Sequence, residues 1–155
     1  MFHITKTGRE IFKDVCRALT DRKIAFEADK ENLRLYAKDI KGTDLPIAVQ
    51  IVVDDETTTL NFACPLAFKA PPASYSDVLI QLNTINTGIR FGAFILNPED
   101  GWLGYRYSYI YAQARPSGEM ISALVGMVIK IVDEYDDRLK KIVPVNTAVH
   151  DPMFG

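Results

Sequence analysis

The sequence predicts an α+β protein in which helices cover one face of an antiparallel sheet. Three segments carry apolar residues at helical spacing, and several shorter segments alternate apolar and polar residues. Short polar turns separate consecutive alternating segments, which is typical of an antiparallel meander. The predicted order is one helix, three or four strands, a second helix, two strands and a third helix.

The first helix is predicted from a T-x-x-E capping box at Thr7 and Glu10, in which each side chain would satisfy a free backbone N–H group. We expect it to end near residues 21–23. Its apolar face consists of Ile11, Phe12, Val15, Cys16 and Leu19.

Four strand candidates follow the first helix, and period-two alternation gives each of them one inward-facing set of side chains. Polar turns interrupt the pattern, and Pro65 ends it. The predicted inward sets are Ile24, Phe26 and Ala28; Leu33, Leu35 and Ala37; Ile47, Val49, Ile51 and Val53; and Thr58, Leu60, Phe62 and Cys64.

The second helix is expected after a capping signal formed by Ser74 and Asp77. Its apolar stripe consists of Tyr75, Val78, Leu79, Leu82 and Ile85. Gly88 is expected to end this helix in a left-handed cap.

Residues 89–96 and 102–112 are predicted to form a hairpin around the turn sequence 97–101. A five-residue loop would place Ala93 opposite Tyr105, whereas a four-residue loop would place Phe94 there, and the sequence leaves both open. The third helix is expected from about residue 117 to about residue 143, with residues 144–155 as a loose tail. Its predicted apolar face is Ile121, Leu124, Val125, Val128, Ile131, Val132, Tyr135 and Leu139.

The composition fits one globular domain spanning residues 1–155. Hydrophobic residues make up 48% of the chain, and 18 basic against 20 acidic residues leave a net charge of −2. This balance argues against disorder and against nucleic acid as a partner. The N-terminus lacks the apolar stretch of a secretion signal, and no apolar run approaches the length of a membrane span, so we expect a cytoplasmic protein without a membrane partner.

The chain offers little material for catalysis or metal binding. Cys16 and Cys64 fall in predicted elements and are expected to be reduced and buried, while His3 and His150 lie in the terminal segments. Phosphate-binding glycine loops, nucleophile elbows and metal-ligand spacings are absent from the sequence. We therefore expect no catalytic residues, no cofactor and no metal, and a protein that is not an enzyme.

The densest charge run is Asp133, Glu134, Asp136 and Asp137 in the third helix. Because basic residues follow directly and neither His nor Cys adjoins the run, a solvated helix face is favoured over a metal or acid/base site.

One strand carries four of the seven tyrosines, and they share one face. These side chains either pack against the helices or form an aromatic surface for a protein partner. The candidate protein-binding residues are Trp102, Tyr105, Tyr107, Tyr109 and Tyr111.

A segment of the chain resembles the YbjN family, described as bacterial sensory transduction regulators. The resemblance rests on the pattern Leu82-Asn83-x-x-Asn86, Arg90-Phe91-Gly92-x-Phe94 and Asp100-Gly101-x-Leu103-x-Tyr105-Arg106, together with the order of elements over about residues 7–143. It implies a fold like that of type III secretion chaperones, which are homodimers that hold an extended client segment. Within the pattern, structural roles are expected for Asn83, Asn86, Gly92 and Gly101.

The sequence and the resemblance together predict a non-enzymatic protein-binding module, chaperone-like or regulatory, that forms a homodimer. The alternative is a small-molecule or lipid binder with a pocket between the sheet and the C-terminal helix. Gly92, Gly104 and Gly126 would leave room for such a pocket. An enzyme built from scattered carboxylates is the third and least favoured hypothesis.

Overall fold

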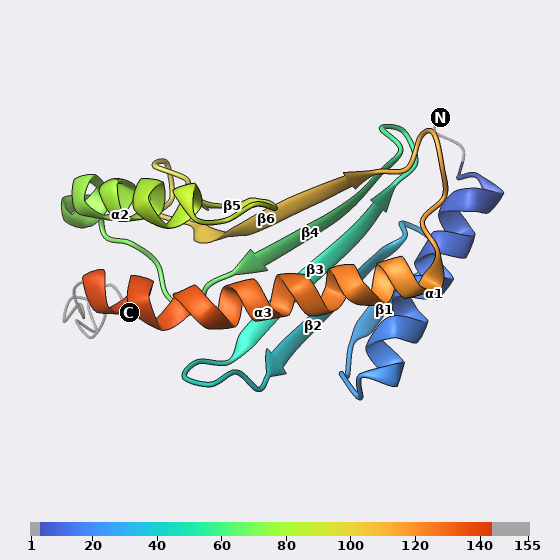
Figure 1. Ribbon diagram of the computed structural model, residues 1–155, viewed down its shortest axis with the longest axis horizontal. Coiled ribbons are helices and arrows are strands. Elements are labelled where there is room, and N and C mark those ends of the chain that lie inside the picture. The colour runs from blue at the N-terminus through green and yellow to red at the C-terminus, as the bar shows by residue number, and fades with distance from the viewer. Residues whose placement is uncertain (1–3, 144–155) are drawn as a thin grey trace.

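The computed structural model describes residues 4–143, which form a six-stranded antiparallel sheet, three α-helices and a 3-10 turn. The strand order is β1-β2-β3-β4-β6-β5 (Figure 1). The predicted α+β class and order of elements are confirmed, including the fourth strand. The strands are β1 (Glu27–Asp29), β2 (Arg34–Ile40), β3 (Ile47–Asp54), β4 (Thr59–Pro65), β5 (Ala93–Leu96) and β6 (Leu103–Ile110).

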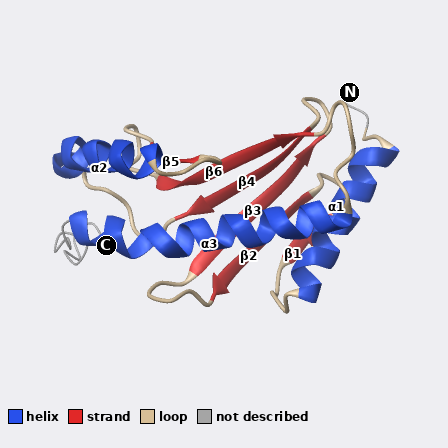
Figure 2. Cartoon of the chain, in the orientation of Figure 1, coloured by secondary structure: helices blue, strands red, loops and turns tan. Residues whose placement is uncertain are grey.

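The helices are distributed unevenly over the sheet (Figure 2). The long helix α3 crosses one face of the sheet, where it packs on β3 and on α1, while α2 packs along the edge strand β5. The helical elements are α1 (Lys6–Asp21), η1 (Pro72–Ser74), α2 (Tyr75–Thr87) and α3 (Gly118–Ile142). The expected tail and both histidines lie outside the described residues.

The N-terminus of α1 differs from the prediction. The helix is capped by Thr5, whose Oγ1 accepts a hydrogen bond from the Gly8 N–H at 3.0 Å, and Thr7 lies inside the helix. Asp55 in the β3–β4 loop fixes Thr5, because its Oδ2 accepts bonds from Thr5 N at 2.6 Å and Thr5 Oγ1 at 2.9 Å. The capping box at Thr7 and Glu10 is therefore wrong, and a long-range contact selects the cap.

Helix α2 ends at Thr87 with Gly88 following it, as predicted, but the capping interactions expected at its two ends are wrong. The Ser74 hydroxyl donates to the Pro71 carbonyl at 2.7 Å and does not cap the helix, since Ser74 itself sits in the 3-10 turn. Gly88 has a right-handed φ of −96°. The left-handed residue comes four positions later, at Gly92 with φ +73°, where a Cβ atom would collide with the Tyr105 hydroxyl.

Three hairpins share one loop design of four residues. An Asp or Asn side chain before each loop accepts the backbone N–H two residues ahead, and the last loop residue has positive φ. In the β5–β6 hairpin this design pairs Phe94 with Tyr105, so the four-residue alternative is the correct one. The residue pairs that define the loops are Asp29 with Leu33 (φ 51°), Asp54 with Thr58 (φ 52°), and Asn97 with Gly101 (φ 76°).

The core lies between the helices and one face of the sheet, as the alternation predicts. The inward residues of β2, β3 and β4 are buried, while their outward neighbours are exposed or half-buried. The first strand is shorter than predicted: Ile24 and Phe26 precede it, and β1 contains only three residues. Residues 24–26 therefore lie beside the sheet without belonging to it.

Candidate functional site

The four tyrosines of the candidate surface lie on the inner face of the sheet, and they divide into two pairs. Tyr105 is 0% exposed and Tyr111 is 5% exposed, so packing accounts for both. Tyr107 and Tyr109 are half-buried and pair across β4 with the core residues Phe62 and Leu60.

The two buried tyrosines, Tyr105 and Tyr111, each hydrogen-bond a distant part of the chain. The Tyr105 hydroxyl donates to the Phe91 carbonyl at 2.5 Å, and burial raises the pKa of this phenol. The Tyr111 hydroxyl donates to the Asp55 carboxylate, which also holds Thr5. Burial and the Asp55 contact both raise the pKa of Tyr111. Because these phenols are occupied inside the chain, they are not available to a partner.

A smaller aromatic group remains at the surface, and we call it the β6 aromatic surface: Phe91, Tyr107 and Tyr109. Phe91 is 51% exposed, and its ring meets Tyr107 edge-on with 6.3 Å between centroids. Phe62 supports Tyr107 from the core at 6.1 Å. Burial, and next the neighbouring Tyr109, raise the pKa of Tyr107, so its hydroxyl remains a neutral donor and acceptor at neutral pH.

Trp102 is separated from the tyrosines by the sheet. Its ring covers Gly104, where an added Cβ would collide with the indole on the outward-facing side. Residues of the same parity along β6 share a face, so Trp102 belongs with Arg106 and not with the tyrosines. The five candidate residues therefore do not form one continuous surface.

The family-pattern residue with the clearest structural role is Asn86 in the last turns of α2. Its Nδ2 donates to the Phe94 carbonyl at 3.0 Å, and its Oδ1 accepts the Phe94 N–H at 2.9 Å. Asn86 thus pairs with the outer edge of β5 as a neighbouring strand would. Gly92 and Gly101 supply positive φ at two turns, whereas Asn83 is exposed on the helix.

The acidic run of α3 does not form a uniform solvated face. Asp133 accepts hydrogen bonds from Thr43 N at 2.6 Å and Thr43 Oγ1 at 2.8 Å, and so holds the β2–β3 loop. Asp137 pairs with Lys141 at 2.9 Å, and Glu134 is exposed. The remaining acid of the run, Asp136, faces the core. Helical periodicity could have revealed this, because residue 136 belongs to the same helix face as the buried positions 125, 128, 132 and 139.

Asp136 is the exception: it is 1% exposed, so the solvated interpretation is wrong for it. Its Oδ1 accepts the Asp137 N–H at 2.7 Å, but its Oδ2 has no hydrogen-bond partner within residues 4–143. Burial raises the pKa of this carboxyl to about 6, and nearby acidic groups add to the shift. In the described part of the chain, no group of three or more His, Cys, Asp and Glu side chains could hold a metal ion.

The two cysteines are free thiols. Cys64 is fully buried, and burial raises its thiol pKa to about 12. Cys16 is only half-buried, and burial raises its pKa as well. A raised pKa keeps each thiol protonated at neutral pH, which disfavours nucleophilic chemistry.

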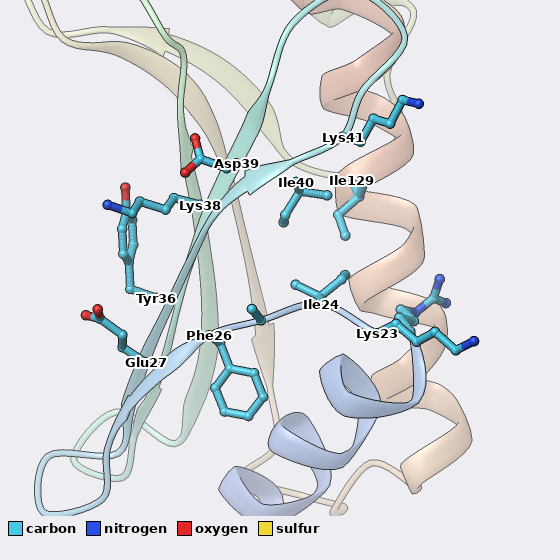
Figure 3. Close-up of a pocket in the computed structure, with 12 residues that line it drawn as sticks. Lys23, Ile24, Phe26, Glu27, Tyr36, Lys38, Asp39, Ile40, Lys41 and Ile129 are labelled. Carbon is cyan, nitrogen blue, oxygen red and sulfur yellow. The ribbon is translucent and has the colours of Figure 1, made fainter.

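A groove of about 800 Å³ opens at the β1 edge of the sheet (Figure 3). We call it the edge groove; it is bounded by residues 22–27, residues 36–41 and Ile129 of α3. It exists because β1 pairs only with residues 34–36, while β2 continues to Ile40. The register of β2 shifts after Ala37, where Asp39 has φ +57°, and this bulge turns the end of the strand away from residues 24–26.

The alternative hypothesis expects a pocket between the sheet and the C-terminal helix, whereas the edge groove lies at the edge of the sheet and takes only Ile129 from that helix. The glycines invoked for that pocket do not create it. Their open sides are filled by the Tyr105 hydroxyl at Gly92, the Trp102 ring at Gly104 and the Arg22 guanidinium at Gly126. These glycines permit close packing, and the bulge in β2 makes the space.

The geometry describes a small α+β protein with an aromatic surface on one strand and a groove at one edge. A family model matches residues 12–141, and the chain belongs to that family, YbjN, which carries the description "putative bacterial sensory transduction regulator". The resemblance seen in the sequence is thereby confirmed.

Among solved structures, the crystal structure of E. coli YbjN, described as a putative transcription regulator, has a similar fold. The TM-score is 0.62 at 14% sequence identity, and the match covers 83% of this chain and 90% of that chain. No match was found among curated proteins. The expected likeness to type III secretion chaperones stays a prediction. None of the helices in residues 4–143 is long and apolar enough to cross a membrane.

Proposed function

We propose that this chain is a regulatory module that acts by binding a protein partner through the β6 aromatic surface, without catalysing a reaction. The observation that carries the proposal is the exposed ring of Phe91 standing edge-on against the half-buried Tyr107. Membership of a family described as regulators supports the regulatory class.

Only part of the aromatic group on β6 remains accessible to a partner. Helix α3 packs over β3, so the inner face of β6 beyond Tyr105 is less fully covered than the centre of the sheet. Tyrosine and phenylalanine bury a large area on binding at a low cost in side-chain entropy, which makes such rings frequent anchors in interfaces. In the chaperone-like form of the proposal, the partner contributes an extended segment.

The partner can be captured by a photo-crosslinking amino acid incorporated in place of Tyr107 in the native host. The matched control carries the same group in place of Tyr36, an exposed tyrosine on the outward face of β2. We expect a partner to crosslink from position 107 and not from position 36.

The captured protein is then purified and its affinity measured. The double variant Tyr107→Ala and Tyr109→Ala should bind about tenfold or more weakly, because truncating anchor residues typically costs more than ~1 kcal/mol each. Tyr36→Ala should bind like the unmodified chain, and urea unfolding verifies that all variants are folded. Equal affinity of the double variant and the Tyr36→Ala control would rule out this surface.

The homodimer is a separate part of the proposal, and it rests on the family resemblance. Light scattering at tens of micromolar protein measures it directly. A mass of twice the chain supports the dimer, and a strict monomer at that concentration removes it.

A further inference from the structure

The edge groove has an apolar floor formed by residues that pack against the core and remain partly accessible. Ile24, Ile40 and Ile129 come from three different elements, and all three are only half-buried. Figure 3 shows their side chains directed into the space between residues 24–26 and the end of β2. Covering such a floor releases water from apolar surface and contributes roughly 25 cal/mol per Å² buried.

The rim of the edge groove is basic although the whole chain is acidic. Among the lining residues, Arg22, Lys23, Lys38 and Lys41 stand against Glu27 and Asp39, an excess of two positive charges on a chain of net charge −2. Figure 3 places Lys38, Glu27 and Asp39 on the side of β2 away from the three isoleucines, and Lys23 and Lys41 on the α3 side. None of these lysines forms an ion pair within residues 4–143. Arg22 donates one bond to the Ser122 carbonyl at 2.9 Å, which holds its guanidinium at the groove.

We propose that the edge groove binds a small anionic amphiphile with one alkyl chain, of the fatty-acid type. The alkyl chain lies on the three isoleucines, and the carboxylate is paired by the basic rim through charge-assisted hydrogen bonds. The volume of about 800 Å³ falls within the range of about 300–1,000 Å³ that is usual for small-ligand sites. This site lies at the opposite edge of the sheet from β5 and is independent of the β6 aromatic surface.

The form of the strand edge favours a small molecule over a polypeptide strand. A peptide that extended the sheet would need a regular backbone edge on β2. The register shift after Ala37 and the positive φ of Asp39 interrupt that edge. Lysines on a strand edge also discourage strand pairing, and Lys38 and Lys41 flank the interruption. An alkyl chain makes no backbone hydrogen bonds and is insensitive to the bulge.

The test uses the full chain and dodecanoate below its micellar concentration, followed by isothermal titration calorimetry. We expect saturable one-to-one binding. Dodecyltrimethylammonium, which has the same chain and a positive head, should not bind. Absence of saturable dodecanoate binding would overturn the proposal, as would equal binding of the two amphiphiles.

Charge variants locate the site. The pair Lys23→Glu and Lys41→Glu should weaken dodecanoate binding about tenfold, which corresponds to about 1.4 kcal/mol. The pair Lys13→Glu and Lys69→Glu, exposed lysines outside the groove, changes the net charge equally and should leave affinity unchanged. Equal loss in both pairs would mean non-specific attraction and overturn the site.

An apolar variant and a membrane probe complete the test. Ile129→Ala should weaken dodecanoate binding while urea unfolding verifies a folded chain. If binding is unchanged in Ile129→Ala, the alkyl chain lies elsewhere and the proposal fails. Phosphatidylglycerol vesicles test whether the groove binds a membrane surface instead of a free amphiphile. If the protein sediments with the vesicles but does not bind monomeric dodecanoate, the proposal is overturned in favour of a membrane surface.

Discussion

At one edge of the sheet, the Asn86 amide bonds to both outward-facing backbone groups of Phe94; at the other edge, β1 covers only part of β2. Helix α2 packs against the β5 edge, and the Asn86 side chain makes the hydrogen bonds that a further strand would make there. The β1 edge has three exposed residues and a neighbouring bulge, and it leaves the edge groove open. The contrast teaches that a side chain and a helix close one edge of this sheet, while a short strand and a bulge leave the other edge partly open.

Removing the closing side chain should have the largest effect. Asn86→Ala leaves the N–H and carbonyl of the buried Phe94 without their partner, at about 1–3 kcal/mol for each unsatisfied group. Urea unfolding should show a loss of about 2–4 kcal/mol. The matched control is Asn83→Ala one turn earlier, which is exposed and should stay within about 0.5 kcal/mol of the unmodified chain. Equal costs for the two variants would show that Asn86 does not close the edge.

Amide hydrogen exchange compares the two edges without any mutation. The Phe94 amide is buried and bonded to Asn86, whereas the amides of β1 lie in a three-residue strand that is exposed throughout. Opening of a short exposed strand needs little free energy. We expect β1 amides to exchange faster than the Phe94 amide by on the order of 100-fold after correction for intrinsic rates. Similar protection at both edges would remove the contrast.

Helix α3 contacts elements near both edges of the sheet. Its buried carboxyl group, Asp136, is expected to give the smallest effect on stability of the three predictions. Tyr135 packs on Phe94 near the closed edge, Asp133 holds Thr43 beyond the end of β2, and Asp136 directly follows Tyr135 in the sequence. Because the folded pKa of Asp136 is raised from 3.8 to about 6, the folded chain takes up a proton more readily than the unfolded chain. Stability contributed by the protonated carboxyl is therefore lost as pH rises from about 4 to about 6.

Asp136→Asn removes this penalty because it carries no charge. We expect the free energy of unfolding to rise by about 1–2 kcal/mol at pH 7.5 and to change little at pH 4. Urea unfolding at the two pH values measures this, with the exposed Glu134→Gln as the control. A variant that is less stable than the unmodified chain at pH 7.5 would show that the charged carboxylate is favoured in the fold.

The sequence predicts those parts of the fold that depend on local periodicity. The alternation in β2, β3 and β4 and the apolar face of α3 required no long-range information. The hairpin register was also within reach, because Asp29, Asp54 and Asn97 each precede a loop of the same length. Comparing the three loops would have favoured the four-residue alternative.

Features that depend on distant partners were not predictable. Asp55, which is 50 residues away, determines the N-cap of α1 through its hydrogen bond to Thr5. The local pattern of Thr7 and Glu10 contains no information about this contact. Whether a tyrosine of β6 is buried or half-buried depends on how far helix α3 extends over that strand. Predicting this would require knowing how the whole sheet packs against the helix. The edge groove follows from a bulge whose positive φ falls on Asp39, a residue with no distinctive sequence signal.

The position of Trp102 offers a way to watch one part of the molecule alone. It is the single tryptophan of the chain, and its ring rests on Gly104 beside the β5–β6 loop. Its fluorescence therefore reports on this hairpin, while circular dichroism averages over every helix and strand. If the two signals change at the same urea concentration, the hairpin and the rest of the chain unfold as one cooperative unit. An earlier change in fluorescence would identify the hairpin as a separate unfolding unit with its own, lower free energy of unfolding.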